Sequence, residues 1–600
     1  MPSSPIVKTA FPLWPNTVFS SLLVLLIAVA AMFGSQLGNT LIVPLLILGC
    51  LSAGFQWFFG ERASTNSAIL LLSGIFVVWT ILSLCFSTTS TVGLIAVQEA
   101  CALILLFWCE LHKKQEEKSK LRDLLHVSLV WIAVLCCLSG IAVYVLQPFP
   151  RFVGTFFDPQ LARSVFPNGF AGFLLLCWPF AWLGGTQKTS VKVAVTSLLL
   201  ACLLLTLSRA AILVLLIQIA FVLWIARPST KSLLAVVCTT ALLVLGIAGA
   251  RSLHFSVPSP VERITFTDES KKVPVTERRD LWAQALTLSA ERPLFGWGPE
   301  SFIFASQRLQ THPLAVSDDP HNVLLSLSAE RGLVAAASFL FLCILAAAAA
   351  WNYAKKNALV LASMAGAGGV LLHSFLDRDL KFLAIALPFW ILLGLMIPEQ
   401  SSKKSKQNFF HIPVAIFLSF ALLGSLFWNQ KGETLLGEGQ KALTENRLPE
   451  AMEILESYVS QNTQDPRGWI VYGQALAAEE RDEEALAMFH EAYRLGKYNY
   501  PDALLGITSL AVLTNDQTIV GDRLASIEGM TRVFIDAIAA NDHYAAILTT
   551  PEVIVDVLED LKILNPVKTA RYTELQKEVQ TNADLHRRIG AQNTEGKLWR

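Results

Sequence analysis

Cationic side chains and histidines gather in one long polar stretch, residues 251–322, which lies between two strongly apolar parts of the sequence. Arg278 and Arg279 belong to this stretch, and Arg209 stands where two apolar runs meet with almost no linker. Planar guanidinium groups bind phosphate oxygens in pairs, so these arginines are candidates for holding a diphosphate. His321 can exchange a proton near neutral pH, which makes it a candidate general base toward a hydroxyl.

Each of these residues also has a plainer interpretation. Arg209, at a membrane boundary, can extend its side chain to lipid head groups. His321 can be a helix-start residue bonded to a nearby carbonyl, and Gly296 and Gly298 can simply form a tight turn. The adjacent carboxylates Asp318 and Asp319 resemble a hydrolase pair only on paper, because neighbouring side chains need not face one cleft.

The order of the polar residues is more specific than any one of them. Arg278 precedes Trp282 by four positions, and His321 and Asn322 come directly before an apolar run. Between and after them stand a Pro-x-x-Gly-x-Gly element, residues 293–298, and a Glu-x-Gly element, residues 330–332. Together these elements resemble the signature of the O-antigen ligase and polymerase superfamily.

Two further stretches are similar to that family, and the likeness covers roughly residues 145–395. Arg151 with Gly154, followed by Pro167 and Asn168, resembles its Arg/Gly and Pro-Asn element, and Ser208–Arg209 resembles its Ser-Arg element. The Pro-Asn element follows Arg151 after a longer stretch than usual. Ala335 stands where relatives often carry a second glycine.

The resemblance implies a membrane fold of about a dozen helices and an inverting, metal-independent glycosyl transfer from undecaprenyl diphosphate, with no cofactor. It assigns catalysis to His321 and Arg278, and diphosphate binding to Arg209 and to Arg278 or its neighbour Arg279. Charge that develops on the leaving diphosphate would be offset by the arginines, while the histidine takes the acceptor proton. Supporting roles are expected for Arg151, Asn168, Trp282, Asn322 and Glu330.

The composition requires a membrane-embedded body to position these residues. Of 600 residues, 53% are hydrophobic and only 16% are charged, which excludes an ordinary soluble enzyme. A helix of about 20 apolar residues crosses a bilayer. Thirteen stretches satisfy this criterion, near residues 18–34, 41–59, 67–86, 92–110, 126–147, 169–186, 192–207, 210–226, 232–250, 333–351, 358–375, 381–397 and 411–428.

Lysines and arginines in short connections orient such a bundle, because they favour the cytoplasmic side. With the N-terminus inside, 16 of them fall on inside links, including the cluster Lys113 to Arg122, and five fall on short outside links. This orientation predicts a multi-pass protein of the bacterial inner membrane. The long loop 251–322 and the chain after about residue 429 would then lie in the periplasm.

The sequence divides into a membrane domain, residues 1–428, which contains the catalytic loop 251–322, and a C-terminal domain, residues 429–600. The first 429 residues carry 30 basic and 20 acidic side chains, whereas the remaining 171 carry 17 and 27. In the second part Trp469, Tyr472, Gly473, Ala485 and Phe489 resemble a tetratricopeptide repeat, and a 34-residue offset aligns this unit with the one before it. The whole chain is therefore predicted to be all-α.

Several functions remain open within this frame. The expected donor is an undecaprenyl-diphosphate glycan, and the acceptor can be lipid A core (ligase), a second lipid-linked glycan (polymerase) or a protein hydroxyl (O-oligosaccharyltransferase). Helical repeats offer a surface for a protein partner, membrane lipids surround the body, and no nucleic acid is expected. A lipid transporter and an assembly scaffold are alternatives from other classes. Glu99 is the most conspicuous ionisable residue inside a predicted span, where charges are costly and suggest function.

Overall fold

The computed structural model describes residues 14–59, 66–147, 149–157, 165–184, 188–255, 275–311, 315–399, 432–497, 499–514, 527–529, 531–532, 535 and 551–594. Within these ranges the chain forms helices and no strand, and Phe157 and Val165 make an isolated β-bridge. The predicted all-α class is confirmed.

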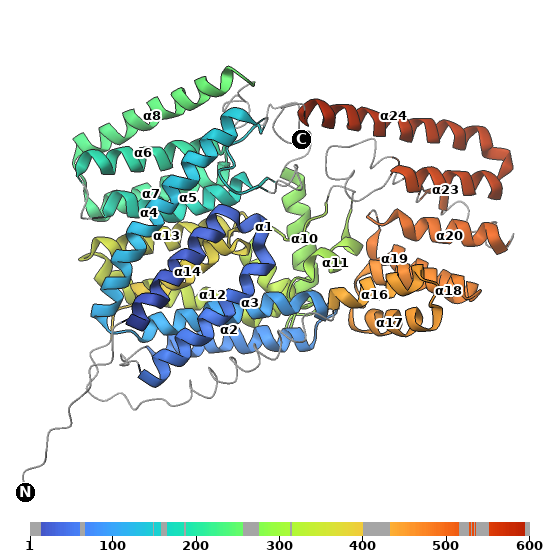
Figure 1. Ribbon diagram of the computed structural model, residues 1–600, viewed down its shortest axis with the longest axis horizontal. Coiled ribbons are helices and arrows are strands. Elements are labelled where there is room, and N and C mark those ends of the chain that lie inside the picture. Colours follow the sequence, from blue (N-terminus) through green and yellow to red (C-terminus); the bar gives the residue numbers. More distant parts are fainter. Residues whose placement is uncertain are drawn as a thin grey trace, which may run out of the picture.

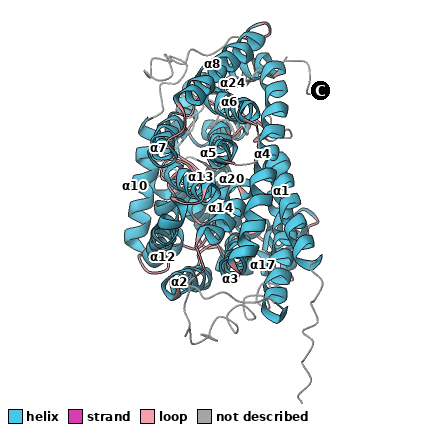
Figure 2. Cartoon of the chain, turned by 90° about the vertical axis from the view of Figure 1, so that its left-hand side faces the viewer, coloured by secondary structure: helices cyan, strands magenta, loops and turns pink. Residues whose placement is uncertain are grey.

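Helices from the first 399 residues form a bundle that runs along the long axis of the molecule (Figure 1) and is seen nearly end-on after a quarter turn (Figure 2). Helices satisfy their backbone hydrogen bonds internally, as a bilayer requires. The bundle comprises α1 (Trp14–Phe59), α2 (Ser67–Cys85), α3 (Ser90–His112), α4 (Gln115–Leu146), α5 (Pro167–Leu183), α6 (Thr189–Leu205), α7 (Arg209–Ala226), α8 (Thr230–Ser252), α12 (Val323–Ala354), α13 (Ala358–Ser374) and α14 (Leu383–Met396).

Most of these helices coincide with predicted membrane spans. Among the described residues, α2, α4, α7, α8, α12 and most of α3 are each long and apolar enough to cross a bilayer. Shorter apolar helices, including α5, α6, α13 and α14, lie among them. The chain is thus a multi-pass membrane protein.

Two predicted spans at the start of the chain are corrected by α1. Residues 18–34 and 41–59 were expected to be separate helices, but they belong to one helix of 46 residues that passes through Pro44. The polar stretch between them does not force a turn, because a helix bonds its own backbone whatever its side chains are. The predicted span 411–428 lies outside the described residues.

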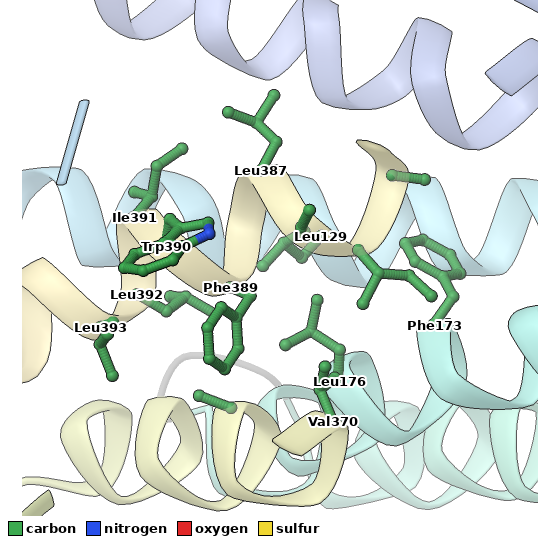
Figure 3. Close-up of a cluster of buried hydrophobic side chains, with 14 of the residues drawn as sticks. Leu129, Phe173, Leu176, Val370, Leu387, Phe389, Trp390, Ile391, Leu392 and Leu393 are labelled. Atoms are coloured by element: carbon green, nitrogen blue, oxygen red, sulfur yellow. The ribbon is translucent and has the colours of Figure 1, made fainter. Parts of the chain in front are cut away.

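Helix α14 occupies the centre of the bundle. All 14 of its residues are buried, and a helix that is apolar on every side needs neighbours all round. It contacts α1, α3 and α13. Figure 3 shows Phe389 and Trp390 of this helix among aliphatic side chains that include Val370 of α13 and Leu176 of α5.

One end of the bundle carries two fully buried cations of α4. Lys118 donates from Nζ to the carbonyl oxygen of Ile397 (2.8 Å), and Arg122 donates from Nη1 to the carbonyl oxygen of Leu395 (2.8 Å). The last carbonyls of a helix have no partner within that helix, and cations stabilise them. These two residues of the predicted cytoplasmic cluster therefore cap the C-terminal end of α14.

The long polar stretch contains helices that the sequence analysis did not predict. They are α10 (Val275–Glu291), the single turn α11 (Phe302–Ala305) and the short 3₁₀ helix η1 (Gln307–Leu309). Leu281, Ala285 and Leu288 recur at helical spacing along α10 and pack with Trp297 and Phe302 in a small core of their own. This core fixes α10 relative to the start of α12.

The C-terminal part consists of paired helices. They are α16 (Gly432–Thr444), α17 (Leu448–Gln461), α18 (Pro466–Ala478), α19 (Asp482–Gly496), α20 (Pro501–Thr514), α23 (Pro551–Leu564) and α24 (Thr569–Thr594). α16 and α17 begin at residues 432 and 448, and α18 and α19 begin at 466 and 482, so both helices recur after 34 residues. This is the offset found in the sequence.

The C-terminal helices lie beyond the same end of the bundle as α10 and α11 (Figure 1) and touch that region directly. Asn499 donates from Nδ2 to Oε1 of Gln310 (2.6 Å), and Lys497 donates to the backbone carbonyl oxygen of Gln310 (3.1 Å). The guanidinium carbon of Arg467 lies 5.3 Å from the centre of the Phe304 ring. The repeats are therefore packed against the loop.

Candidate functional site

Asp377 is the centre of a polar network at the loop end of the bundle, in the connection that follows α13. Its Oδ2 accepts hydrogen bonds from Nδ2 of Asn168 (2.6 Å) and Nη2 of Arg278 (2.9 Å). Its Oδ1 accepts from the backbone N–H of Arg378 (2.9 Å) and faces Nδ1 of His321 at 3.3 Å. A carboxylate has about four lone-pair sites, so this one is fully engaged.

The same contacts keep Asp377 ionised. Burial alone would raise its pKa, but the hydrogen bond with His321 and the charges of His321, Arg278 and His373 outweigh burial and hold the pKa well below its usual range. Asp377 is therefore a fixed negative charge between three candidate site residues.

His321 is held in a defined orientation. Its backbone has a positive φ of 55°, and its N–H donates to Oδ1 of Asp319 (2.7 Å). With Nδ1 directed at Asp377, the other ring nitrogen, Nε2, lies 3.5 Å from Oγ of Ser317. A histidine that donates from Nδ1 to a carboxylate carries a free lone pair on Nε2, so Nε2 is the atom that can accept a proton.

The three predicted diphosphate-binding arginines differ in position. The side chain of Arg278 is 35% exposed and paired with Asp377, whereas Arg279, the next residue of α10, is exposed. Arg209 is the first residue of α7, and its guanidinium lies within electrostatic range of that of Arg278. The geometry thus groups Arg209 and Arg278 and leaves Arg279 on the outer surface of α10.

Arg151 and Asn168 form a chain of hydrogen bonds that ends at Asp377. Arg151 donates from Nε to the backbone carbonyl oxygen of Thr206 (2.7 Å) and from Nη2 to Oδ1 of Asn168. Asn168 in turn donates to Asp377, so this hydrogen-bond chain connects the segment before Arg209 with Asp377. The longer stretch between Arg151 and the Pro-Asn element does not keep the two residues apart.

Asn322 has a local structural role. Its Oδ1 accepts from the backbone N–H groups of Leu324 (3.0 Å) and Leu325 (3.1 Å), which caps the first turn of α12. Its Nδ2 donates to the carbonyl oxygen of Phe375 (2.9 Å). Asn322 therefore links the start of α12 to the segment that carries Asp377.

The Pro-x-x-Gly-x-Gly and Glu-x-Gly elements dock on each other through their backbones. Trp297 N–H donates to the carbonyl oxygen of Ala329 (3.0 Å), and Gly298 N–H donates to that of Glu330 (2.8 Å). Gly332 interrupts α12 with φ 85° and ψ 167°, a region open essentially to glycine alone. A Cβ there would lie 2.0 Å from the carbonyl oxygen of Leu294. Here the glycines set the turn geometry and the close packing.

Trp282 and Glu330 occupy different surroundings. Trp282 lies on α10, and its Nε1 is buried without a hydrogen-bond partner among the described residues. Glu330 is 2% exposed, and its Oε1 lies 3.9 Å from Nζ of Lys381. Lys381 also donates to Oε1 of Glu300 (2.6 Å) and approaches Oδ2 of Asp319 at 3.8 Å. Burial opposes the charge of Lys381, but these carboxylates raise its pKa.

From the sequence, the outer helix end at His373, with Asp377, Arg378 and Asp379 just beyond it, is a candidate lining of the acceptor entrance, but no role in the transfer step was expected for Asp377, Arg378 or Lys381. They follow an apolar span in an alternating run of charges, Asp377-Arg378-Asp379-x-Lys381, and this run is the signal that was available. Arg378 pairs with Asp318, and His373 Nδ1 lies 2.6 Å from Oδ2 of the buried Asp379.

His312 and the loop cations Arg263, Lys271 and Lys272 lie outside the described residues. No group of three or more possible metal-binding side chains occurs in the part of the chain that the structure describes.

The fold and this site define a polytopic membrane protein with an arginine-rich centre and a carboxylate-oriented histidine. Residues 194–340 match the family model described as O-antigen ligase. The matched range includes Arg209, Arg278, His321 and Glu330, whereas Arg151, Asn168 and Asp377 lie outside it. No curated protein compared with the chain gives a significant match.

Proposed function

We propose that this chain transfers a glycan from undecaprenyl diphosphate to an acceptor hydroxyl, with lipid A core as the preferred acceptor. The family match supports a reaction of the ligase or polymerase type. The observation that carries the finer proposal is the shared carboxylate, because Asp377 brings Arg278 and His321 together and Arg209 lies in range of Arg278.

Arg209 and Arg278 are assigned to the diphosphate. The two positively charged guanidinium groups repel each other in the empty site, and a bound anion offsets this repulsion. As the bond between the anomeric carbon and the phosphate oxygen breaks, negative charge grows on the leaving diphosphate. Arginines already in place stabilise that charge without rearrangement.

His321 is assigned to the acceptor. The acceptor hydroxyl gives its proton to Nε2, and its oxygen forms the new bond to the anomeric carbon. The lipid diphosphate leaves from the opposite face with the electron pair of the broken bond, so the configuration inverts. Asp377 stabilises the imidazolium that results and keeps Nδ1 protonated throughout.

The proposed location is the outer face of a bacterial inner membrane. The loop helices and the C-terminal repeats lie at one end of the bundle, and the cations Lys118 and Arg122 lie at the end of α14. The excess of cations on the predicted inside links supports a cytoplasmic N-terminus and a periplasmic site. The domains would then be a membrane body, residues 1–428, and a periplasmic repeat domain, residues 429–600.

A protein acceptor or protein partner is the second candidate, and the docked repeats favour it. Gln310 connects the repeats to the loop that carries His321, so a peptide held by the repeats would lie near the transfer site. Within the same class, a polymerase would use another lipid-linked glycan as the acceptor. A transporter or a scaffold would leave the carboxylate-oriented histidine without a role.

Reconstitution of the full chain tests the proposal. The purified protein is given an undecaprenyl-diphosphate glycan and, in separate reactions, lipid A core, a second lipid-linked glycan and a protein with exposed Ser and Thr. We expect transfer to one of them, and the His321→Ala variant should lose about 10³-fold in rate, the contribution typical of a general base. Movement of the lipid-linked glycan across the bilayer by His321→Ala, with no transfer by the wild type, would support a transporter instead.

The reaction should also proceed in the presence of a metal chelator, because arginines supply the positive charge. Loss of transfer with EDTA that added divalent ions restore would contradict the assignment of Arg209 and Arg278.

A further inference from the structure

A cavity of about 110 Å³ adjoins the His321 site and has no part in the transfer step proposed above. It lies between α3, α12 and α14, and the part of its wall that it shares with the site is formed by Asp319, Glu330, Asp377, Arg378 and Lys381. Glu99, the ionisable residue that the sequence placed inside a span, lines it from α3. The cavity is therefore a polar hollow that extends from the site into the bundle.

The cavity is lined by buried polar atoms that lack a hydrogen bond among the described residues. Ser374 Oγ and Glu330 Oε1 make no hydrogen bond among the described residues, although Ser374 is 0% and Glu330 is 2% exposed. Both residues line the cavity. A buried polar atom without a hydrogen bond costs about 1–3 kcal/mol. Glu330 Oε1 has the charge of Lys381 Nζ at 3.9 Å, but both it and Ser374 Oγ can still accept a hydrogen bond from a ligand in the cavity.

An aromatic cluster completes the lining. Phe76, Phe339 and Trp390 all face the cavity. The Phe76 ring centre lies 5.9 Å from that of Phe339 and 6.0 Å from that of Trp390. Aromatic rings beside a few fixed polar groups are typical of ligand pockets. A sugar ring suits such a wall, since it has an apolar face and hydroxyls at its edge.

The charge of the cavity decides which ligand it suits. Asp319, Glu300, Glu330, Glu99 and Asp377 contribute carboxyl groups, whereas the cations that line it are Lys381, Arg331 and Arg378. Asp377 is paired with Arg278, and Arg378 is paired with Asp318, which leaves four carboxyl groups and two cations. Four carboxyl groups against two remaining cations disfavour an anion. The diphosphate therefore belongs with Arg209 and Arg278, and the cavity suits a neutral or amino-bearing group.

We propose that this cavity binds one neutral or amino sugar residue of a glycan substrate, whose hydroxyls donate to Glu330 and Ser374 while its ring packs on the aromatic cluster. Complete ligand sites usually have about 300–1,000 Å³, so a cavity of this size holds one unit of a longer molecule. The inference rests on the proposed glycan transfer and adds a saccharide subsite to it. Uronic acid residues are disfavoured by charge.

A binding experiment on the full-length protein tests the subsite without requiring turnover. Free N-acetylglucosamine, glucosamine and glucuronic acid are the probes, and saturation-transfer NMR measures their binding. We expect the first two to bind and glucuronic acid to bind at least about tenfold more weakly. Glu330→Gln and Ser374→Ala should each weaken binding by about tenfold, the loss expected for one hydrogen bond to a buried polar group.

Glu110→Gln is the matched control for Glu330→Gln, because Glu110, on α3, is also a buried carboxyl. It lines a different cavity together with Lys113, to which its Oε1 is paired at 2.6 Å. This control should bind the probes like the wild type. Melting temperatures establish that each variant is folded. Equal binding of all three probes, binding of none, or an equal effect of Glu110→Gln would overturn the subsite.

Transfer assays separate the two sources of the sugar and the two proposals. A rise in KM for the lipid-linked glycan places a donor sugar in the cavity, and a rise in KM for the acceptor places an acceptor sugar there. Probe binding that depends on Glu330, without any transfer by the wild type, would refute the proposed function and retain the subsite. Transfer with both KM values unchanged in Glu330→Gln and Ser374→Ala would refute the subsite alone.

Discussion

The two ends of the bundle use basic side chains in different ways. At one end Lys118 and Arg122 donate to main-chain carbonyl oxygens at the end of α14. At the other, Arg278 and His321 share the side chain of Asp377, and both remain partly exposed, at 35% and 26%. A cation bonded to a helix end stabilises the fold, whereas basic side chains arranged around one carboxylate at an accessible surface can also bind a ligand. Lys118, Arg122 and Arg278 are equally basic in the sequence, and their partners and exposure in the fold distinguish them.

The largest expected effect is at the shared carboxylate. Asp377→Asn removes the negative charge that orients His321 and stabilises its protonated form, so the transfer rate should fall by about 10³-fold. Abundance and melting temperature in detergent, measured beside the rate, show whether the loss is catalytic. A rate within tenfold of the wild type would mean that His321 does not depend on this carboxylate.

The neighbouring arginines of α10 should differ by a smaller factor. Arg278→Lys keeps the charge but loses the planar pair of donors, and we expect about a 10²-fold loss in transfer. Arg279→Lys is the matched variant on the exposed face, and its rate should stay within about twofold, as for most surface substitutions. The two rates are measured at saturating acceptor. Similar losses in both would place Arg279 at the diphosphate.

At the opposite end of the bundle, the expected effect is on stability. Lys118→Met removes the hydrogen bond to the carbonyl oxygen of Ile397 at the end of α14, so the free energy of unfolding should fall by about 2 kcal/mol. The midpoint of denaturant unfolding should fall, while the transfer rate per folded molecule stays unchanged. A catalytic loss at an unchanged midpoint would contradict the division between the two ends.

The smallest effect is a pH dependence. The folded-state pKa of Asp377 lies below its usual value, so the ionised carboxylate stabilises the folded protein above the unfolded pKa of about 4, and this is lost as pH falls through the folded pKa. The difference in unfolding free energy between wild type and Asp377→Asn should therefore be constant between about pH 5 and 8 and shrink only below about pH 4. A difference that disappears by pH 6 would show that another group is responsible.

Apolar runs predicted most helices of the bundle, because the length of a membrane helix is set by the bilayer. The same criterion failed at α1, since side-chain polarity between two runs does not decide whether the backbone stays helical. It also missed α10, whose apolar positions Leu281, Ala285 and Leu288 recur at helical spacing in a polar stretch. The periodicity was present in the sequence, but a search for long apolar segments does not detect it.

The candidate site was predictable as far as its residues belong to ordered motifs. Arg278 and His321 lie in the long loop, and their closeness agrees with the expectation of a shared site, although their roles remain proposals. The role of Asp377 as the shared carboxylate was not predicted, because its four contacts come from Asn168, Arg278, His321 and Arg378, which are distant in sequence or lie in the main chain. A single carboxylate after an apolar span does not reveal such partners.

The docking of the loop glycines on the break in α12 has a consequence for protein engineering. The joint is made by main-chain atoms of Trp297, Gly298, Ala329 and Glu330, so it depends on spacing and on the glycines at positions 296, 298 and 332. Substitutions at Arg331, whose side chain takes no part in this joint, should leave the frame that carries the His321 loop in place. Changing loop length between residues 293 and 298 should disturb it. Substrate choice could therefore be altered by substitutions at positions such as Arg331 while the main-chain joint stays intact.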